Sequence, residues 1–173
     1  MTAWHTPSDN PPDAPSAEPL EEPAALLAEW RRVTAEGLNA SRAQCLAHAL
    51  AWHQQALQIA HHLFHHVSSG IADDDRLAAF IVAHINLADC YAALGECNDA
   101  VDCLCCAHHQ LLSLIASDST PEPMRMAAYR HLRESQAAMN EFCAEHGDHP
   151  LMEQALLRQR AMQGAHLAST TLH

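Results

Sequence analysis

Glycine and proline divide this chain into helix-length segments, and that division limits the possible folds more than any other feature of the sequence. From residue 23 to residue 168 the segments are rich in Ala, Leu, His and Gln and poor in β-branched residues, a composition that favours helices. No segment alternates apolar and polar residues as a half-buried strand does. We therefore predict an all-α domain over residues 23–168.

The breaks between segments predict six helices. Gly70 is expected to follow the C-terminus of the second helix, while Gly95 and Gly147 end the third and fifth. Asp73–Asp75 would supply an N-cap and first-turn carboxylates, and Ser119-Thr120 a capping hydroxyl before Pro121. The expected ranges are about 23–37, 42–67, 74–94, 97–116, 121–145 and 150–168. Their short connections predict three antiparallel hairpins.

Both ends of the chain differ from this domain. Residues 1–22 hold five carboxylates, no arginine and many prolines, which predicts a disordered acidic tail. Residues 169–173 are expected to be a frayed C-terminus. The tail has neither the basic start nor the apolar stretch of a signal peptide.

Charge and cysteine content restrict the environment and the partners. Nine arginines and no lysine stand against 21 carboxylates, for a formal charge of −12. This charge argues against nucleic acid and against anionic membranes as partners. No apolar run is long enough for a membrane span. The odd number of cysteines, seven, fits a reducing compartment, so we expect a cytoplasmic protein.

Small and large side chains recur at regular spacings between residues 81 and 114. Small residues would leave room where two helices cross, the large ones would fill the neighbouring gaps, and a glycine would allow the turn. The residues concerned are Leu87, Ala88, Tyr91, Gly95, Ala100, Leu104 and Ala107. This pattern resembles the tetratricopeptide repeat (TPR).

The other two hairpins follow the pattern less closely. In the first, Gly37 takes the small position, and Ala49, His53 and Ala56 repeat the spacing of the second helix. Ala40, however, replaces the aromatic residue. In the third, Arg133 stands where a small residue belongs if Leu132 is aligned with Leu87.

The resemblance implies a TPR-like, right-handed solenoid of about three helical hairpins. Its concave groove would bind a peptide or helix of another protein, without catalysis and without a cofactor, as scaffolds, adaptors and chaperone-like proteins do. The groove residues that the resemblance implies are Val82, Ile85, Asn86, Asp89 and Ala93. The apolar end faces of such a stack also allow a homodimer.

Some TPR domains bind a C-terminal carboxylate through lysines, arginines and an asparagine at the place of Asn86. This chain has no lysine, and Thr34 occupies the matching position of the first hairpin, which argues against that mode. Val82, Ile85 and Ala93 favour an apolar or helical ligand instead.

Metal binding or metal sensing is the alternative function. His61 with His65, and His62 with His66, are four residues apart, so each pair lies on one side of a helix and can hold a metal ion. A solvated polar face is the preferred explanation of these histidines, and a pH-dependent role near the helix C-terminus is a third.

The cysteines and the remaining motifs do not predict an enzyme. Cys103, Cys105 and Cys106 precede His108 and His109, but without the spacing of a zinc site. A core position is expected for Cys90 and Cys97, and exposed, redox-sensitive thiols for Cys105 or Cys106.

Cys143 and His146 are three residues apart near a helix end, with no third partner in the sequence. The chain contains no GxSxG, P-loop or GxGxxG motif.

Overall fold

The protein is all-helical in the computed structural model, which describes residues 23–66 and 70–170. In those ranges it forms six helices and no strand, so the all-α prediction is confirmed. The helices are α1 (Pro23–Arg42), α2 (Leu46–His65), α3 (Asp73–Ala93), α4 (Cys97–Ala116), α5 (Glu122–His146) and α6 (Pro150–Thr170). The predicted acidic tail, residues 1–22, and residues 171–173 lie outside the described residues.

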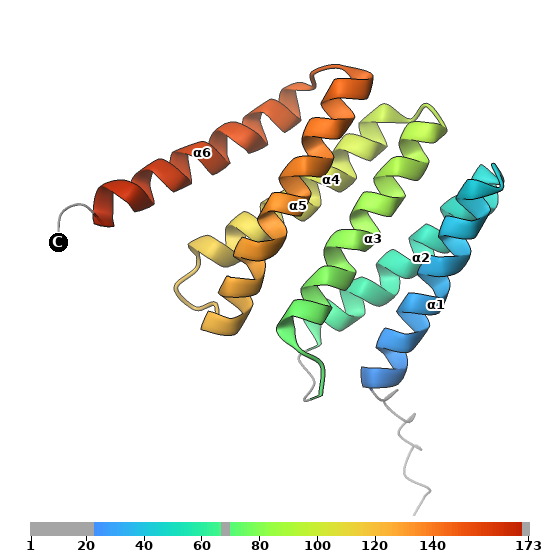
Figure 1. Ribbon diagram of the computed structural model, residues 1–173, viewed down its shortest axis with the longest axis horizontal. Helices are drawn as coiled ribbons and strands as arrows, with labels where there is room; N and C mark the ends of the chain where they lie inside the picture. Colours follow the sequence, from blue (N-terminus) through green and yellow to red (C-terminus); the bar gives the residue numbers. More distant parts are fainter. Residues whose placement is uncertain (1–22, 67–69, 171–173) are drawn as a thin grey trace, which may run out of the picture.

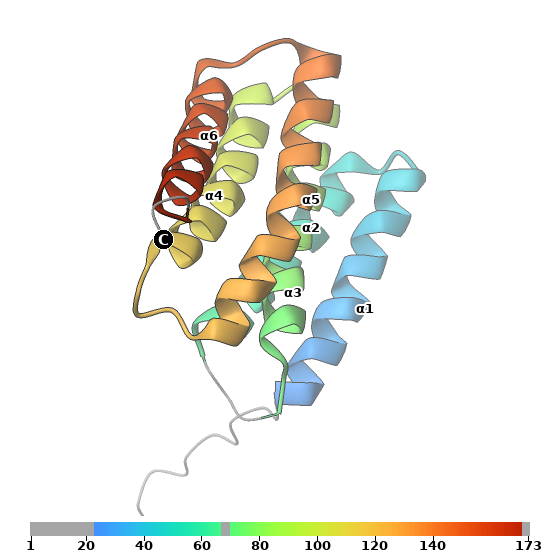
Figure 2. The same ribbon diagram turned by 60° about the vertical axis from the view of Figure 1, so that its left-hand side comes forward.

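The helices alternate between two layers. From α1 to α5 each helix packs against the next one in the chain, and contacts also join α1 to α3, α3 to α5 and α4 to α6. Figures 1 and 2 show α1, α3 and α5 in one layer and α2, α4 and α6 in the other. Within the first layer the three helices run in the same direction. Helix α6 diverges from α5 and lies against α4.

The small residues of the predicted repeat are buried. Ala88, Ala100 and Ala107 are at most 1% exposed. In the first hairpin a Cβ on Gly37 would lie 2.6 Å from Cε1 of His53. Only glycine therefore allows α1 and α2 to approach this closely with the His53 ring between them.

The predicted turn between α1 and α2 was misplaced. Helix α1 continues past Gly37 to Arg42, and α2 begins at Leu46 rather than near residue 42. Gln44, with a φ of +58°, is the left-handed residue in this turn. Gly37 lies inside α1 and packs against His53, at the small position that the sequence analysis gave it.

Three predicted helix caps were also wrong. Helix α2 ends at His65 with His66 as its C-cap, so Gly70 lies too far along the chain to follow it directly. Ala72 is the N-cap of α3, which places Asp73–Asp75 in the first turn. Pro121 is the N-cap of α5 and makes no side-chain cap, so the preceding hydroxyls do not start this helix. Positive φ angles at two other predicted turns, Gly95 and Gly147, agree with the sequence.

The hairpins are longer than the repeat they resemble. Helices α3 and α4 contain 21 and 20 residues, more than a 34-residue repeat can include. The alignment of Leu132 with Leu87 also fails as a guide to packing, because Asp74 of α3 contacts Arg130 of α5, an offset of 56 residues. Leu132 is buried and Arg133 points to solvent.

Candidate functional site

A cavity of about 400 Å³ opens between the C-terminal halves of α3 and α5. Of the five predicted groove residues, Ile85, Asp89 and Ala93 line it. Val82 and Asn86 are half-buried on α3 and do not line it. The remaining lining residues are Ala92 from α3 and Ala138, Glu141, Phe142, Glu145 and His146 from α5.

The cavity combines apolar walls with carboxylates. Ile85, Ala138 and Phe142 belong to or pack against the hydrophobic core between α3, α4, α5 and α6. Glu141 and Glu145 are exposed on α5 and add to Asp89 on α3. The predicted apolar groove therefore describes only part of the surface.

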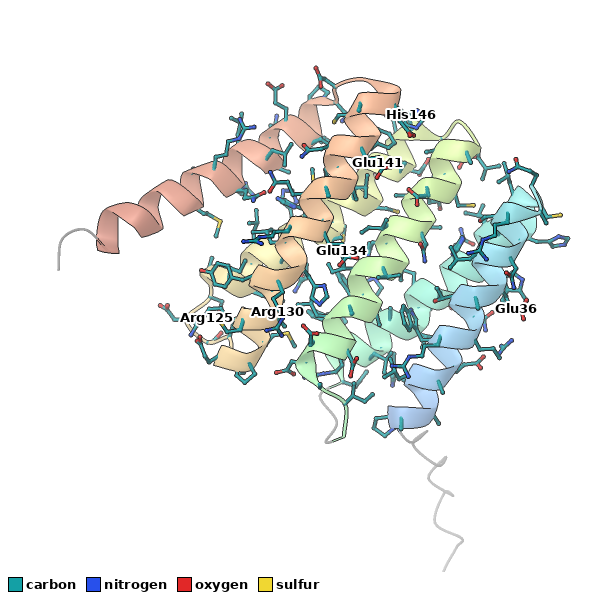
Figure 3. The ribbon with its side chains drawn as sticks, in the orientation of Figure 1. Glu36, Arg125, Arg130, Glu134, Glu141 and His146 are labelled. Carbon is teal, nitrogen blue, oxygen red and sulfur yellow. The ribbon has the colours of Figure 1, made fainter. Side chains whose placement is uncertain are left out.

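The α5 side of the cavity was missed from the sequence. The resemblance supplied positions for α3 only, and the third hairpin was aligned through Leu132. A signal was present, because Glu134, Glu141 and Glu145 are seven and four residues apart and so lie along one side of a helix. Figure 3 shows Glu141 and His146 near one end of α5.

The carboxylates of the cavity repel one another. Burial raises the pKa of Asp89, although this side chain reaches solvent, and the nearby Glu141 and Glu145 raise it further. Among the described residues no arginine pairs with these three carboxylates. The imidazole of His146 lies 3.8 Å from Glu145 and is a counter-ion when protonated. Both α3 and α5 end here, and their dipoles add negative potential.

The opposite end of the α3–α5 interface is neutralised within the protein. Arg130 donates from Nε and Nη2 to Oδ1 of Asp74, at 3.2 and 2.8 Å. His131 lies between two carboxylates, 3.3 Å from Asp74 and 3.1 Å from Glu134. The hydrogen bond and charge of Arg130, with His131, lower the pKa of Asp74. At the same offset of 56 residues, Asp89 faces Glu145 instead of an arginine.

Three histidines are packing residues inside the helix layers. His84 donates from Nδ1 to the Phe80 carbonyl at 2.9 Å, and His108 lies 3.1 Å from the Ser135 hydroxyl. Burial lowers the pKa of both to about 4, helped by His61 for His84 and by His109 for His108. Burial likewise lowers the pKa of His53.

The four histidines at the end of α2 do not converge on one point. His61 is half-buried, with its ring centroid 5.0 Å from that of Phe80, whereas the other three are exposed. The rings of His62 and His66 are 4.1 Å apart, those of His61 and His65 5.9 Å. Within the ranges that the structure describes, no group of three or more His, Cys, Asp or Glu could hold a metal ion.

Three neighbouring thiols of α4 have raised pKa values. Burial is the main cause that raises the pKa of Cys103 to about 12 and that of Cys105 to about 11. Cys105 is buried, contrary to the predicted exposure, and Cys106 is exposed with a raised pKa. The predicted core position is confirmed for Cys90, whereas Cys97 is only half-buried.

The Cys143 thiol lies 3.5 Å from the sulfur of Met152. Among the described residues its hydrogen-bond partner is thus a thioether, which does not act as a base.

Comparisons with known proteins identify a family but no activity. A family model described as a protein of unknown function (DUF2753) matches residues 28–173. No curated protein and no solved structure matches the chain. Among the described residues no helix has the length and apolar character needed to cross a membrane.

Proposed function

The chain belongs to the DUF2753 family of proteins of unknown function, and we propose that its helical domain is a TPR-like module that binds a peptide or helix of another protein. The ligand would lie on the layer formed by α1, α3 and α5. The single observation that carries this proposal is the cavity between α3 and α5, which is lined by three of the five groove residues that the TPR resemblance implies.

Packing supports a TPR-like stack of hairpins. The motif alanines are buried at helix crossings, and alternate helices share a layer, so a third helix contacts the one two positions before it. Such a stack presents one layer of helices as a continuous surface. Val82 and Asn86 lie half-buried on α3, which leaves part of each side chain for a ligand.

The chemistry of the side chains favours binding over catalysis. Thiols with a pKa near 11 or 12 are not nucleophiles at neutral pH. The buried histidines are neutral and engaged in packing. We therefore propose a non-catalytic protein that needs no cofactor, and we place it in the cytoplasm because its seven cysteines are free.

A random peptide library tests this function. Peptides selected on the wild-type protein should lose at least about tenfold in affinity, or about 1.4 kcal/mol, when Ala93→Trp fills the cavity. Ala93 is exposed and lines the cavity, so the change adds bulk without charge. Ile85 is less suitable, since it packs against two core clusters.

The matched control is Ala51→Trp, at an exposed position of α2 in the other layer. This variant should bind the selected peptides as the wild type does. If no peptide is enriched, or if both variants bind equally, the proposed function is wrong.

Metal binding remains a second candidate because the His62 and His66 rings are 4.1 Å apart. Two imidazoles one turn apart can share a metal ion. Metal analysis of untagged protein, repeated on a variant with His61, His62, His65 and His66 changed to Gln, tests it. Stoichiometric metal that is lost in the variant would make metal binding the function of this surface.

A further inference from the structure

We infer that the peptide bound at this face inserts a basic side chain, preferably arginine, into the cavity between Asp89, Glu141 and Glu145. The inference rests on the proposed function and adds the chemistry of the ligand to it. Four features of the cavity carry it: the missing counter-charge, the shape, the spacing of the carboxylates and the surrounding potential.

The first feature is the contrast between the two ends of one helix pair. Near the N-terminus of α3 the carboxylate of Asp74 pairs with the guanidinium of Arg130 from the same chain. Near the C-terminus, Asp89 faces Glu145 with no arginine of the described chain paired to either. Carboxylates that share a cavity repel one another unless a cation enters. At the first end the protein supplies the positive charge itself, and at the second end a ligand would supply it.

The second feature is the mixed chemistry of the walls. The volume of about 400 Å³ is within the usual range for ligand pockets. Arginine and lysine bury an aliphatic stem along apolar surface and keep the charged group in a polar environment. Ile85 and Phe142 provide the apolar surface, and the three carboxylates provide the polar environment.

The third feature separates an organic cation from a metal ion. In the described part of the chain the carboxylates and His146 do not form a group that could hold a metal. A guanidinium group presents five donors in a planar fork and can serve separated carboxylates, which is why arginine fits better than lysine.

The fourth feature is the potential around the cavity. Two helix C-termini converge here, and cations are stabilised near such ends. The chain as a whole carries −12, which steers cationic partners toward it. Its own arginines on α5 are elsewhere: Figure 3 shows Arg125 and Arg130 near the opposite end of the helix from Glu141 and His146.

Selection from a random peptide library, compared between two proteins, tests the inference. On the wild type, arginine or lysine should be enriched at one position of the selected peptides. On Glu141→Gln with Glu145→Gln, this enrichment should disappear. A control with the same change of charge, Asp102→Asn with Glu153→Gln on α4 and α6, should keep it, since both residues are exposed in the other layer.

A selected peptide and its neutral counterpart give the quantitative test. Replacing the enriched arginine by citrulline, or the enriched lysine by acetyl-lysine, keeps the length and removes the charge. Calorimetry should show at least about a tenfold loss of affinity on the wild type and less than about twofold on the double variant. Equal thermal melting of the proteins, followed by circular dichroism, verifies that the variants fold.

The outcomes separate this inference from the function on which it rests. Selected peptides without a basic residue, bound equally by wild type and Glu141→Gln with Glu145→Gln, would overturn the cationic ligand and leave peptide binding in place. A library from which nothing is enriched would overturn both.

Discussion

Both ends of the α3–α5 interface carry carboxylates, but they differ in whether an arginine is paired with them. At one end Asp74 and Glu134 have Arg130 and His131 as partners. At the other, Asp89 and two glutamates surround a cavity. A single helix, α5, supplies Arg130 at the first end and Glu141 and Glu145 at the second. We call the end with Asp74 and Arg130 the closed end, because its carboxylate has a cation of the same chain as partner. We call the end with Asp89, Glu141 and Glu145 the open end, because these carboxylates have no arginine partner in the described residues.

Neither end accounts for the stability of the fold. Exposed ion pairs contribute about 0–1 kcal/mol, and exposed like charges cost similar small amounts. The apolar residues between the ends hold the helices together, including Leu77, Ile81 and Met139, all essentially fully buried. The difference between the ends therefore bears on what the surface binds.

The largest expected effect is the loss of folding stability in acid, which would remove both ends of the helix pair together. His84 and His108 have pKa values of about 4 when folded, against 6.5 as the ordinary value. Because the folded pKa is lowered, stability is complete above pH 6.5 and falls as the pH drops toward 4. Protonation of each histidine then lowers the free energy of unfolding by up to about 3 kcal/mol. Urea unfolding between pH 7.5 and pH 4.5 measures this loss.

Glutamine variants assign the acid effect to these two residues. His84→Gln and His108→Gln should each flatten the pH dependence, even where they lower stability at neutral pH. Ala51→Gln, at an exposed position of α2 that carries no titratable group, should leave the dependence as it is. A pH profile unchanged by the first two variants would contradict the assignment.

A cation placed in the open end should make it resemble the closed end. With Glu145→Arg, an internal guanidinium faces Asp89, so basic peptides should bind at least about tenfold more weakly, a loss of about 1.4 kcal/mol. Calorimetry with a peptide selected on the wild type measures the change. Arg130→Glu is the control at the closed end, and it should leave that affinity within about twofold. An undiminished affinity in Glu145→Arg would place the basic side chain elsewhere.

Removing the cation from the closed end should have a modest effect on stability. Arg130 and Asp74 are 59% and 50% exposed, so Arg130→Ala should lower the free energy of unfolding by no more than about 1 kcal/mol. Added salt should shrink the difference, because it screens exposed charges. Urea unfolding at low and at high salt tests both statements. A loss that does not depend on salt would indicate packing by the arginine stem.

The smallest effect is expected when the charges of the open end are removed. Glu141→Gln with Glu145→Gln should stabilise the protein by a few tenths of a kcal/mol, since two like charges disappear. The pKa of Asp89 should fall while staying above its ordinary value, because burial is the larger cause of its shift. An NMR titration of Asp89 measures this, and an unchanged pKa would show that the glutamates do not act on it.

The helices near clear chain breaks were predictable from the sequence. The bounds of α3 were predicted to within one residue and those of α4 as observed, because the aspartates and Gly95 mark them locally. The turn before α2 has no glycine in the left-handed conformation, and Gln44 takes this role. Local signals of that kind are weak, so the first helix was predicted to end about five residues too early, near residue 37 instead of at Arg42.

The site was predictable only in part. Ile85, Asp89 and Ala93 followed from the TPR resemblance, because it assigns one face of α3. Glu141 and Glu145 did not follow, since their position depends on how far α5 is displaced along α3. That displacement is set by the contacts of helices longer than the repeat, which a motif of 34 residues does not describe.

By itself, the sequence determined that the described part of this chain is all-helical and where most of its helices begin and end, because helix propensity and glycine turns act within a few residues. Only the tertiary structure decided which charges meet. Asp74 pairs with Arg130, whereas Asp89 lies beside Glu145 with no arginine of the described ranges paired to it. Both arrangements depend on the register between helices far apart in the chain. Packing of whole helix faces sets that register, and no local segment contains it.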